Sequence, residues 1–138
     1  MHSHLRVDRG LVDCAHYIRG RPPADAVAQD SHFDELPVPI LSGLSERPSF
    51  AARPRFWLWV SKAFRESPYQ ERLRRLRSLA QATNIPDLQR SVRETGIRWY
   101  VAHPGDSNVW PTEFRDHPAF ESNGYRVYDM RRCFDLRG

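Results

Sequence analysis

The sequence predicts a single α/β domain, in which a small mixed or mostly parallel sheet of about four strands is packed with helices. The chain has 138 residues, the usual size of one domain, and 40% of them are hydrophobic, enough for one core. Segments with helical spacing of apolar residues alternate with short runs typical of strands. We therefore treat residues 1–138 as one domain, with residues 1–8 expected to be disordered or foreign to the natural protein.

Three segments carry the signals of longer helices. Residues 9–19 place apolar side chains at helical spacing, and a glycine and two prolines follow them. Residues 67–70 read Ser-Pro-Tyr-Gln, a capping box that begins a second helix, expected to run to about residue 83. Residues 84–86 read Asn-Ile-Pro and begin a third helix, which Gly96 is suited to end.

Strands are expected at residues 25–29, 39–44, 97–102 and 125–130. The third of these combines Ile, Trp, Tyr and Val, the strongest strand signal in the chain, so we place it at the centre of the sheet. A short helix is expected over residues 56–64, and a short helix or turn over 110–122. A helix between two strands favours a parallel crossover, whereas the last strand could equally pair antiparallel at an edge.

Charge and cysteine content restrict the class of protein. The formal net charge is +4, yet Lys62 is the only lysine among 21 basic residues, and the arginines are scattered without a long basic block. This pattern favours an ordinary charged surface over nucleic-acid binding, for which the arginines of residues 72–77 are the alternative. Cys14 and Cys133 lack metal-ligand spacing, although one disulfide between them stays open. No apolar run approaches the roughly 20 residues that span a bilayer.

Motifs with self-contained chemistry are absent from the sequence. It holds no GxSxG elbow, P-loop, GxGxxG turn or HExxH helix. Histidines and acidic residues in the loops could converge on a metal, but their spacing does not require it. We therefore assign no catalytic residue, no metal ligand and no cofactor.

Polar side chains nevertheless follow two of the expected strands. Asp30 and His32 come after the first strand, and His103 and Asp106 come after the strongest one. Ligands in open sheets bind beyond the carboxyl ends of parallel strands, so these loops form the expected pocket if both strands are parallel. The alternative is that these groups only solvate the ends of loops.

Five short segments follow one another in a characteristic order. They are Tyr-Ile-Arg at 17–19, Pro-Pro-Ala-Asp-Ala-Val at 22–27, Leu-Ser-Glu-Arg-Pro-Ser-Phe at 44–50, Gly-Ile-Arg-Trp-Tyr-Val at 96–101 and Gly-Tyr-Arg-Val-Tyr at 124–128. Together, over about residues 12–130, they resemble the soluble C-terminal domain of bacterial polytopic membrane glycosyltransferases of the GT-C type, which use lipid-linked sugars.

The resemblance implies a non-catalytic accessory domain on the extracytoplasmic, periplasmic face of the bacterial inner membrane. Its partners would be the membrane-embedded part of the same polypeptide and a saccharide or lipid-linked sugar, with nucleic acid disfavoured. The candidate binding residues are Asp30, His32, Glu46, Arg47 and His103. Two alternatives remain: a free-standing small enzyme or nucleotide-binding domain, which would be cytoplasmic, and an arginine-rich nucleic-acid-binding module.

Overall fold

The computed structural model describes residues 9–31, 45, 48 and 68–137. Its centre is a four-stranded mixed sheet with the strand order β1-β2-β4-β3. The strands are β1 (Val27–Asp30), β2 (Ile97–Ala102), β3 (Phe120–Ser122) and β4 (Tyr125–Asp129). β1 and β2 are parallel, while β4 pairs antiparallel with β2 on one side and with β3 on the other. The predicted α/β class is confirmed.

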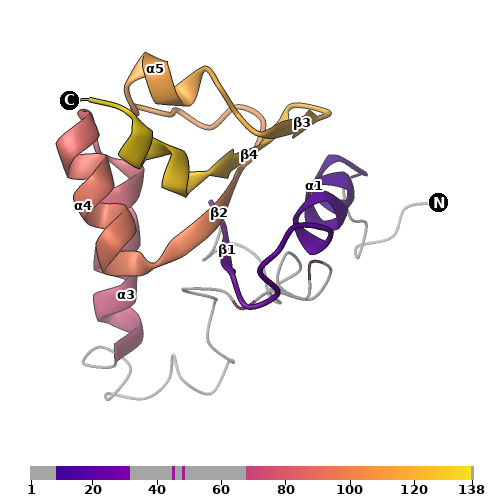
Figure 1. Cartoon of the computed structure of the whole chain (residues 1–138), viewed down its shortest axis with the longest axis horizontal. Helices are drawn as coiled ribbons and strands as arrows, with labels where there is room; N and C mark the ends of the chain where they lie inside the picture. Colours follow the sequence, from indigo (N-terminus) through magenta and orange to yellow (C-terminus); the bar gives the residue numbers. More distant parts are fainter. Residues whose placement is uncertain (1–8, 32–44, 46–47, 49–67, 138) are drawn as a thin grey trace.

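Among the described elements, helix α1 (Arg9–Arg19) covers the first face of the sheet (Figure 1). Helix α1 buries Leu11, Cys14, Ala15 and Ile18, which recur at the spacing of one helix face. They pack with Trp99 and Val101 of β2 and with Tyr125 and Val127 of β4. These strand residues alternate along their strands, because successive side chains point to opposite faces.

The second face is covered by the other helices of the described residues, which lie on the other side of the sheet from α1 (Figure 1). These are α3 (Pro68–Ala80), α4 (Ile85–Thr95), α5 (Thr112–Arg115) and the 3-10 helix η3 (Met130–Asp135). Leucines of α3 and α4 meet an aromatic group made by Tyr100, Trp110, Phe114 and Tyr128. The two helical layers thus enclose the sheet.

Residues at both ends of helix α4 favour its start and its end. The side chain of Asn84 accepts a hydrogen bond from the backbone N–H of Asp87, and Pro86 occupies the first turn. Gly96 ends the helix with φ of 69°, a left-handed conformation that favours glycine. Strand β2 begins at the next residue, so the crossover from α4 delivers this strand parallel to β1.

The structure corrects three expectations. Helix α3 ends at Ala80 rather than near residue 83, because Asn84 needs an extended conformation to cap α4. Residues 120–122, expected within a helix or turn region, form β3. Strand β4 is antiparallel as allowed, but it lies inside the sheet rather than at an edge. The strand expected at 39–44 and the helix expected at 56–64 lie outside the described residues.

The two cysteines lie on opposite faces of the sheet. Cys14 belongs to the cluster under α1, whereas Cys133 belongs to the cluster under the other helices, and both are free and buried. Burial raises the pKa of the Cys14 thiol to about 12 and that of Cys133 to about 11. The disulfide left open by the sequence is not formed. In the described residues no helix is long and apolar enough to cross a bilayer.

Candidate functional site

The carboxyl ends of β1 and β2 lie at the same edge of the sheet because these strands are parallel. Asp30 is the last residue of β1, and His103 directly follows β2. The Nε2 atom of His103 lies 2.6 Å from Oδ1 of Asp30, and both side chains are only 10% exposed. The edge therefore holds a histidine and a carboxylate in direct contact.

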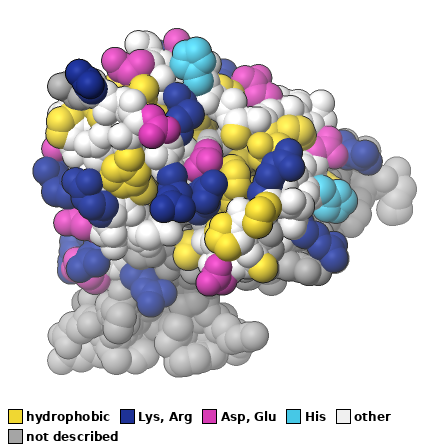
Figure 2. All heavy atoms as spheres, viewed as in Figure 1, with side chains coloured by type: hydrophobic (Ala, Val, Ile, Leu, Met, Phe, Trp, Pro, Cys, Tyr) yellow, Lys and Arg dark blue, Asp and Glu magenta, His cyan; other side chains and the backbone are white. Residues whose placement is uncertain are grey.

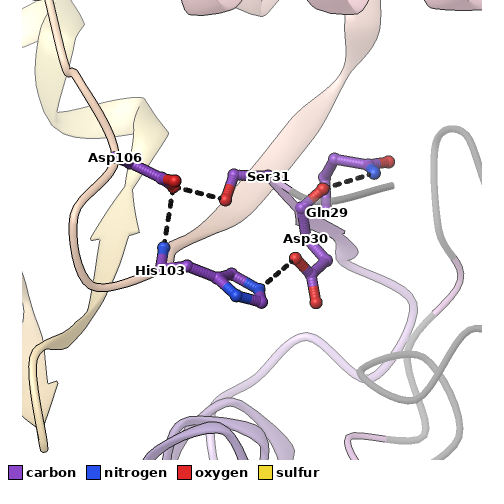
Figure 3. A network of polar contacts seen from close by, with 5 residues as sticks. All are labelled: Gln29, Asp30, Ser31, His103 and Asp106. Atoms are coloured by element: carbon purple, nitrogen blue, oxygen red, sulfur yellow. Dashed lines mark hydrogen bonds and ion pairs between the residues drawn. The ribbon is translucent and has the colours of Figure 1, made fainter. Parts of the chain in front are cut away.

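A second carboxylate ties the loop after β2 to the end of β1 (Figure 3). Oδ2 of Asp106 accepts hydrogen bonds from the Ser31 hydroxyl, at 2.6 Å, and from the backbone N–H of His103, at 2.8 Å. The Ser31 backbone N–H also donates to the carbonyl of Val101, at 2.9 Å. These bonds fix the position of the imidazole relative to both strands.

The arrangement differs from that of a serine hydrolase. In a nucleophilic triad the serine hydroxyl donates to the imidazole, which in turn is held by a carboxylate. Here the hydroxyl of Ser31 donates to Asp106, and His103 contacts a different carboxylate, Asp30. The His103 ring also rests against Tyr125, with ring centroids 4.8 Å apart. The network is suited to positioning groups and to hydrogen bonding with a ligand.

Beside this network lies a hollow of about 190 Å³ on the α3 and α4 face of the sheet. Besides two alanines, its lining consists of Ser31, Tyr100, Asp106, Ser107, Asn108 and Trp110. Tyr100 is 5% exposed, and burial, with the charges of Asp106 and Asp30, raises its pKa. The phenol therefore stays protonated, able to donate a hydrogen bond, throughout the neutral range.

The structure places part of the predicted site. Asp30 and His103, expected to meet only if their strands were parallel, are in contact, and Asp106 joins them through Ser31. His32, Glu46 and Arg47 lie outside the described residues.

Apart from Asp106, the lining of the hollow was not predicted. Tyr100 belongs to a strand that reads as pure core, and Trp110 reads as an ordinary apolar residue. The Ser107-Asn108 pair that follows Asp106 is the one sequence signal that could have extended the site.

Two of the four arginines of α3, Arg74 and Arg75, are engaged within their own helix. Glu71 pairs with Arg74 and, at 3.2 Å, with Arg75, and the Arg74 and Arg75 bonds lower the pKa of Glu71. On the face seen in Figure 2, basic side chains alternate with acidic ones instead of forming one continuous patch. This distribution favours a solvated charged surface over a nucleic-acid interface. Among the described residues, no group of three His, Cys, Asp or Glu side chains could hold a metal ion.

Comparison with known proteins gives no match: no protein-family model, no curated protein and no solved structure aligns with the chain. The geometry at the carboxyl ends of β1 and β2 therefore carries the functional argument.

Proposed function

We propose that this chain is a non-catalytic accessory domain of a membrane glycosyltransferase-like protein, located on the extracytoplasmic face of the membrane. In this role the edge where β1 and β2 end contacts the acceptor or a lipid-linked sugar. The membrane-embedded part of the same polypeptide would supply the chemistry.

The observation that carries the proposal is the hydrogen bonding of Ser31 and His103. Each of these potential reactive groups is bonded to its own carboxylate, Asp106 for the hydroxyl and Asp30 for the imidazole. The imidazole that commonly takes the proton of a catalytic serine is bonded to Asp30 here, so Ser31 lacks the activation found in a serine–histidine pair. The same bonds make a rigid polar edge, which is what recognition of a hydroxylated ligand requires.

The order of the segments supports the setting of the proposal. The Pro-Pro turn at residues 22–23 leads into β1, and Gly96 and Gly124 each precede an aromatic strand, in the order found in the resembling domains.

The location of the native protein tests this proposal. Cells that produce it from its own gene are fractionated, and spheroplasts are treated with protease before immunodetection with an antibody against the chain. We expect sedimentation with the inner membrane and degradation in intact spheroplasts, while a cytoplasmic marker protein stays protected. A signal that remains in the soluble fraction and survives protease until lysis would overturn the proposal.

A small enzyme is the second candidate, favoured by the contact between His103 and Asp30. A carboxylate that orients an imidazole is a common arrangement for a general base. This candidate predicts that the purified chain hydrolyses a substrate unaided and that His103→Asn removes the activity. If a panel of ester, phosphoester and glycoside substrates shows no turnover above that of His103→Asn, the accessory role is favoured.

A further inference from the structure

The hollow beside the polar edge has a construction of its own, distinct from the contact between Asp30 and His103. It lies where β2 ends, between the end of α3 and the loop of residues 106–110. Its volume of about 190 Å³ is below the roughly 300 Å³ at which pockets for drug-sized ligands begin. The space suits one small ring and excludes a nucleotide.

Two aromatic side chains make rigid walls of this hollow. Trp110 is 2% exposed, and its indole N–H donates to the carbonyl of Leu79 at 2.8 Å, which fixes the ring. The Tyr100 ring meets the Trp110 ring edge to face, with centroids 5.0 Å apart. Aromatic walls of this kind offer apolar contact area without a large loss of side-chain entropy.

The Tyr100 hydroxyl is the buried polar group that the fold itself leaves available. Within the described part of the chain it has no hydrogen-bond partner, although the residue is 95% buried and lines the hollow. The hydroxyl oxygen is also not among the fully buried polar atoms without a partner in the described residues, so it keeps some contact with solvent. A buried phenol in this situation finds its partner in water or in a ligand.

Asn108 supplies a second donor. Its side-chain oxygen accepts a hydrogen bond from the backbone N–H of Trp110, at 2.8 Å, which fixes the orientation of the amide. The NH2 group has no partner among the described residues. Ser107 at the exposed rim adds a hydroxyl, and Asp106 adds a carboxylate that can accept hydrogen bonds from a ligand.

The charge of this lining selects the class of ligand. Among the described residues that line the hollow there is no lysine, arginine or histidine, while Asp106 contributes a negative charge. Recognition of phosphate or carboxylate uses cationic groups, so an anion is disfavoured here. Neutral donors, one carboxylate and two aromatic walls fit a ligand that is uncharged and carries several hydroxyl groups.

We propose that this hollow binds a single uncharged, hydroxyl-rich ring, such as a pyranose or a cyclitol, through Tyr100, Asp106 and Asn108. Its source in a glycan acceptor or a lipid-linked sugar rests on the proposed function, whereas the ligand class follows from the lining alone.

The test is a titration of the full 138-residue chain, labelled with ¹⁵N, with glucose, mannose, galactose and myo-inositol, and with inorganic phosphate and AMP as charged probes. We expect saturable chemical-shift changes at residues 100, 106–108 and 110 with at least one polyol, and none there with phosphate or AMP. Changes without saturation, changes confined to other residues, or equal changes with phosphate would overturn the proposal.

Two conservative variants separate binding from folding. Tyr100→Phe deletes the available hydroxyl and breaks no hydrogen bond among the described residues, so we expect an unchanged Tm and affinity lower by about three- to tenfold. Asn108→Asp keeps the acceptor for Trp110 and exchanges the donor for a second negative charge, and binding should fall at least as far. Tyr17→Phe, in helix α1 on the opposite face, is the matched control and should bind as the wild type does. Equal affinity in Tyr100→Phe would refute the assignment.

The failures of the two proposals are distinguishable. A cytosolic protein that binds a cyclitol at these residues would refute the membrane setting and leave the hollow assigned. A periplasmic membrane protein whose hollow responds to no polyol would refute the assignment of the hollow and leave the membrane setting in place.

Discussion

The two faces of the sheet are built differently. On one face, helix α1 approaches the hairpin of β3 and β4 so closely that only glycine fits at residue 10. On the other face, several helices surround the Trp110 aromatic group, and the packing leaves a hollow next to the polar edge. Both faces carry a buried tryptophan, but only that of the hollow face has its indole N–H bonded, to Leu79.

The contrast between the two faces indicates where a ligand can bind. A face sealed by backbone-to-backbone approach has no room for a group that the chain does not itself supply. A face covered by several helices leaves gaps where their ends meet, and such a gap lies between the end of α3 and the loop after β2. Binding sites commonly occupy loops held on a rigid scaffold, and the α1 face serves here as that scaffold.

The largest expected effect comes from removing the tryptophan of the hollow face. Trp110→Ala deletes a fully buried ring that contacts Tyr100, Phe114 and Tyr128, and we expect the free energy of unfolding to fall by about 3–5 kcal/mol. Urea denaturation followed by circular dichroism measures the change. A loss below about 1 kcal/mol would contradict the view that this group is the core of the face.

Trp110→Ala removes a large part of the stability of a small domain. A matched pair of milder variants therefore compares the two faces more directly. Trp110→Phe leaves the Leu79 carbonyl without its donor, whereas Trp99→Phe removes a buried N–H that has no partner among the described residues. We expect Trp110→Phe to cost about 1–2 kcal/mol more than Trp99→Phe. Equal costs would mean that the two faces do not differ in this way.

Another substitution disrupts the close contact between α1 and the hairpin on the α1 face. A Cβ atom at residue 10 would lie 2.5 Å from Cδ1 of Tyr125 and 2.6 Å from the backbone oxygen of Ser122. We expect Gly10→Ala to lower the free energy of unfolding by about 1–3 kcal/mol, despite the higher helix propensity of alanine. The same denaturation experiment reports it.

Gly20→Ala provides the control, because the nearest atoms to its added Cβ are 3.8 Å away. It should be neutral or stabilising by up to about 1 kcal/mol. If both substitutions had the same effect, the close contact between α1 and the hairpin would not matter for stability.

The elements that sequence predicted well are those fixed by local signals. The bounds of α1 and β2 agree with the expected 9–19 and 97–102, and the caps Asn84 and Gly96 set both ends of α4. Strand β3 could not be found in this way, because its three residues become a strand only by pairing with β4. The turn between the two strands has a local signal, because Asn123 and Gly124 adopt positive φ angles there.

The site was predictable only in part for a comparable reason. That Asp30 and His103 meet depends on strand direction, which the sequence favours through the crossover but does not determine. Tyr100 lines a hollow because α3 ends beside it, and this cannot be read from the sequence. In sequence Tyr100 is indistinguishable from a core tyrosine such as Tyr128. Polar residues after strands are therefore visible in sequence, whereas the shape between them is not.

The smallest expected effect concerns a polar link on the α1 face. Oδ2 of Asp13 accepts a hydrogen bond from the Ser122 hydroxyl at 2.7 Å, and Oδ1 accepts one from Arg9 at 3.0 Å. The Ser122 bond is the largest single cause of the lowered pKa of Asp13, and the charge and hydrogen bond of Arg9 lower it further. The carboxylate form is thus favoured by folding, and its contribution is present above the ordinary aspartate pKa of about 3.9 and disappears as the pH falls through the lower folded value.

An NMR titration of the Asp13 carboxyl group measures this link directly. We expect its pKa to rise in both Ser122→Ala and Arg9→Ala, and to rise more in Ser122→Ala, because the serine joins α1 to β3 while Arg9 forms an exposed pair within one helix. Asp13→Asn should accordingly flatten the acid limb of the curve of unfolding free energy against pH. A larger rise in Arg9→Ala would mean that the helix, rather than its contact with the hairpin, holds the charge.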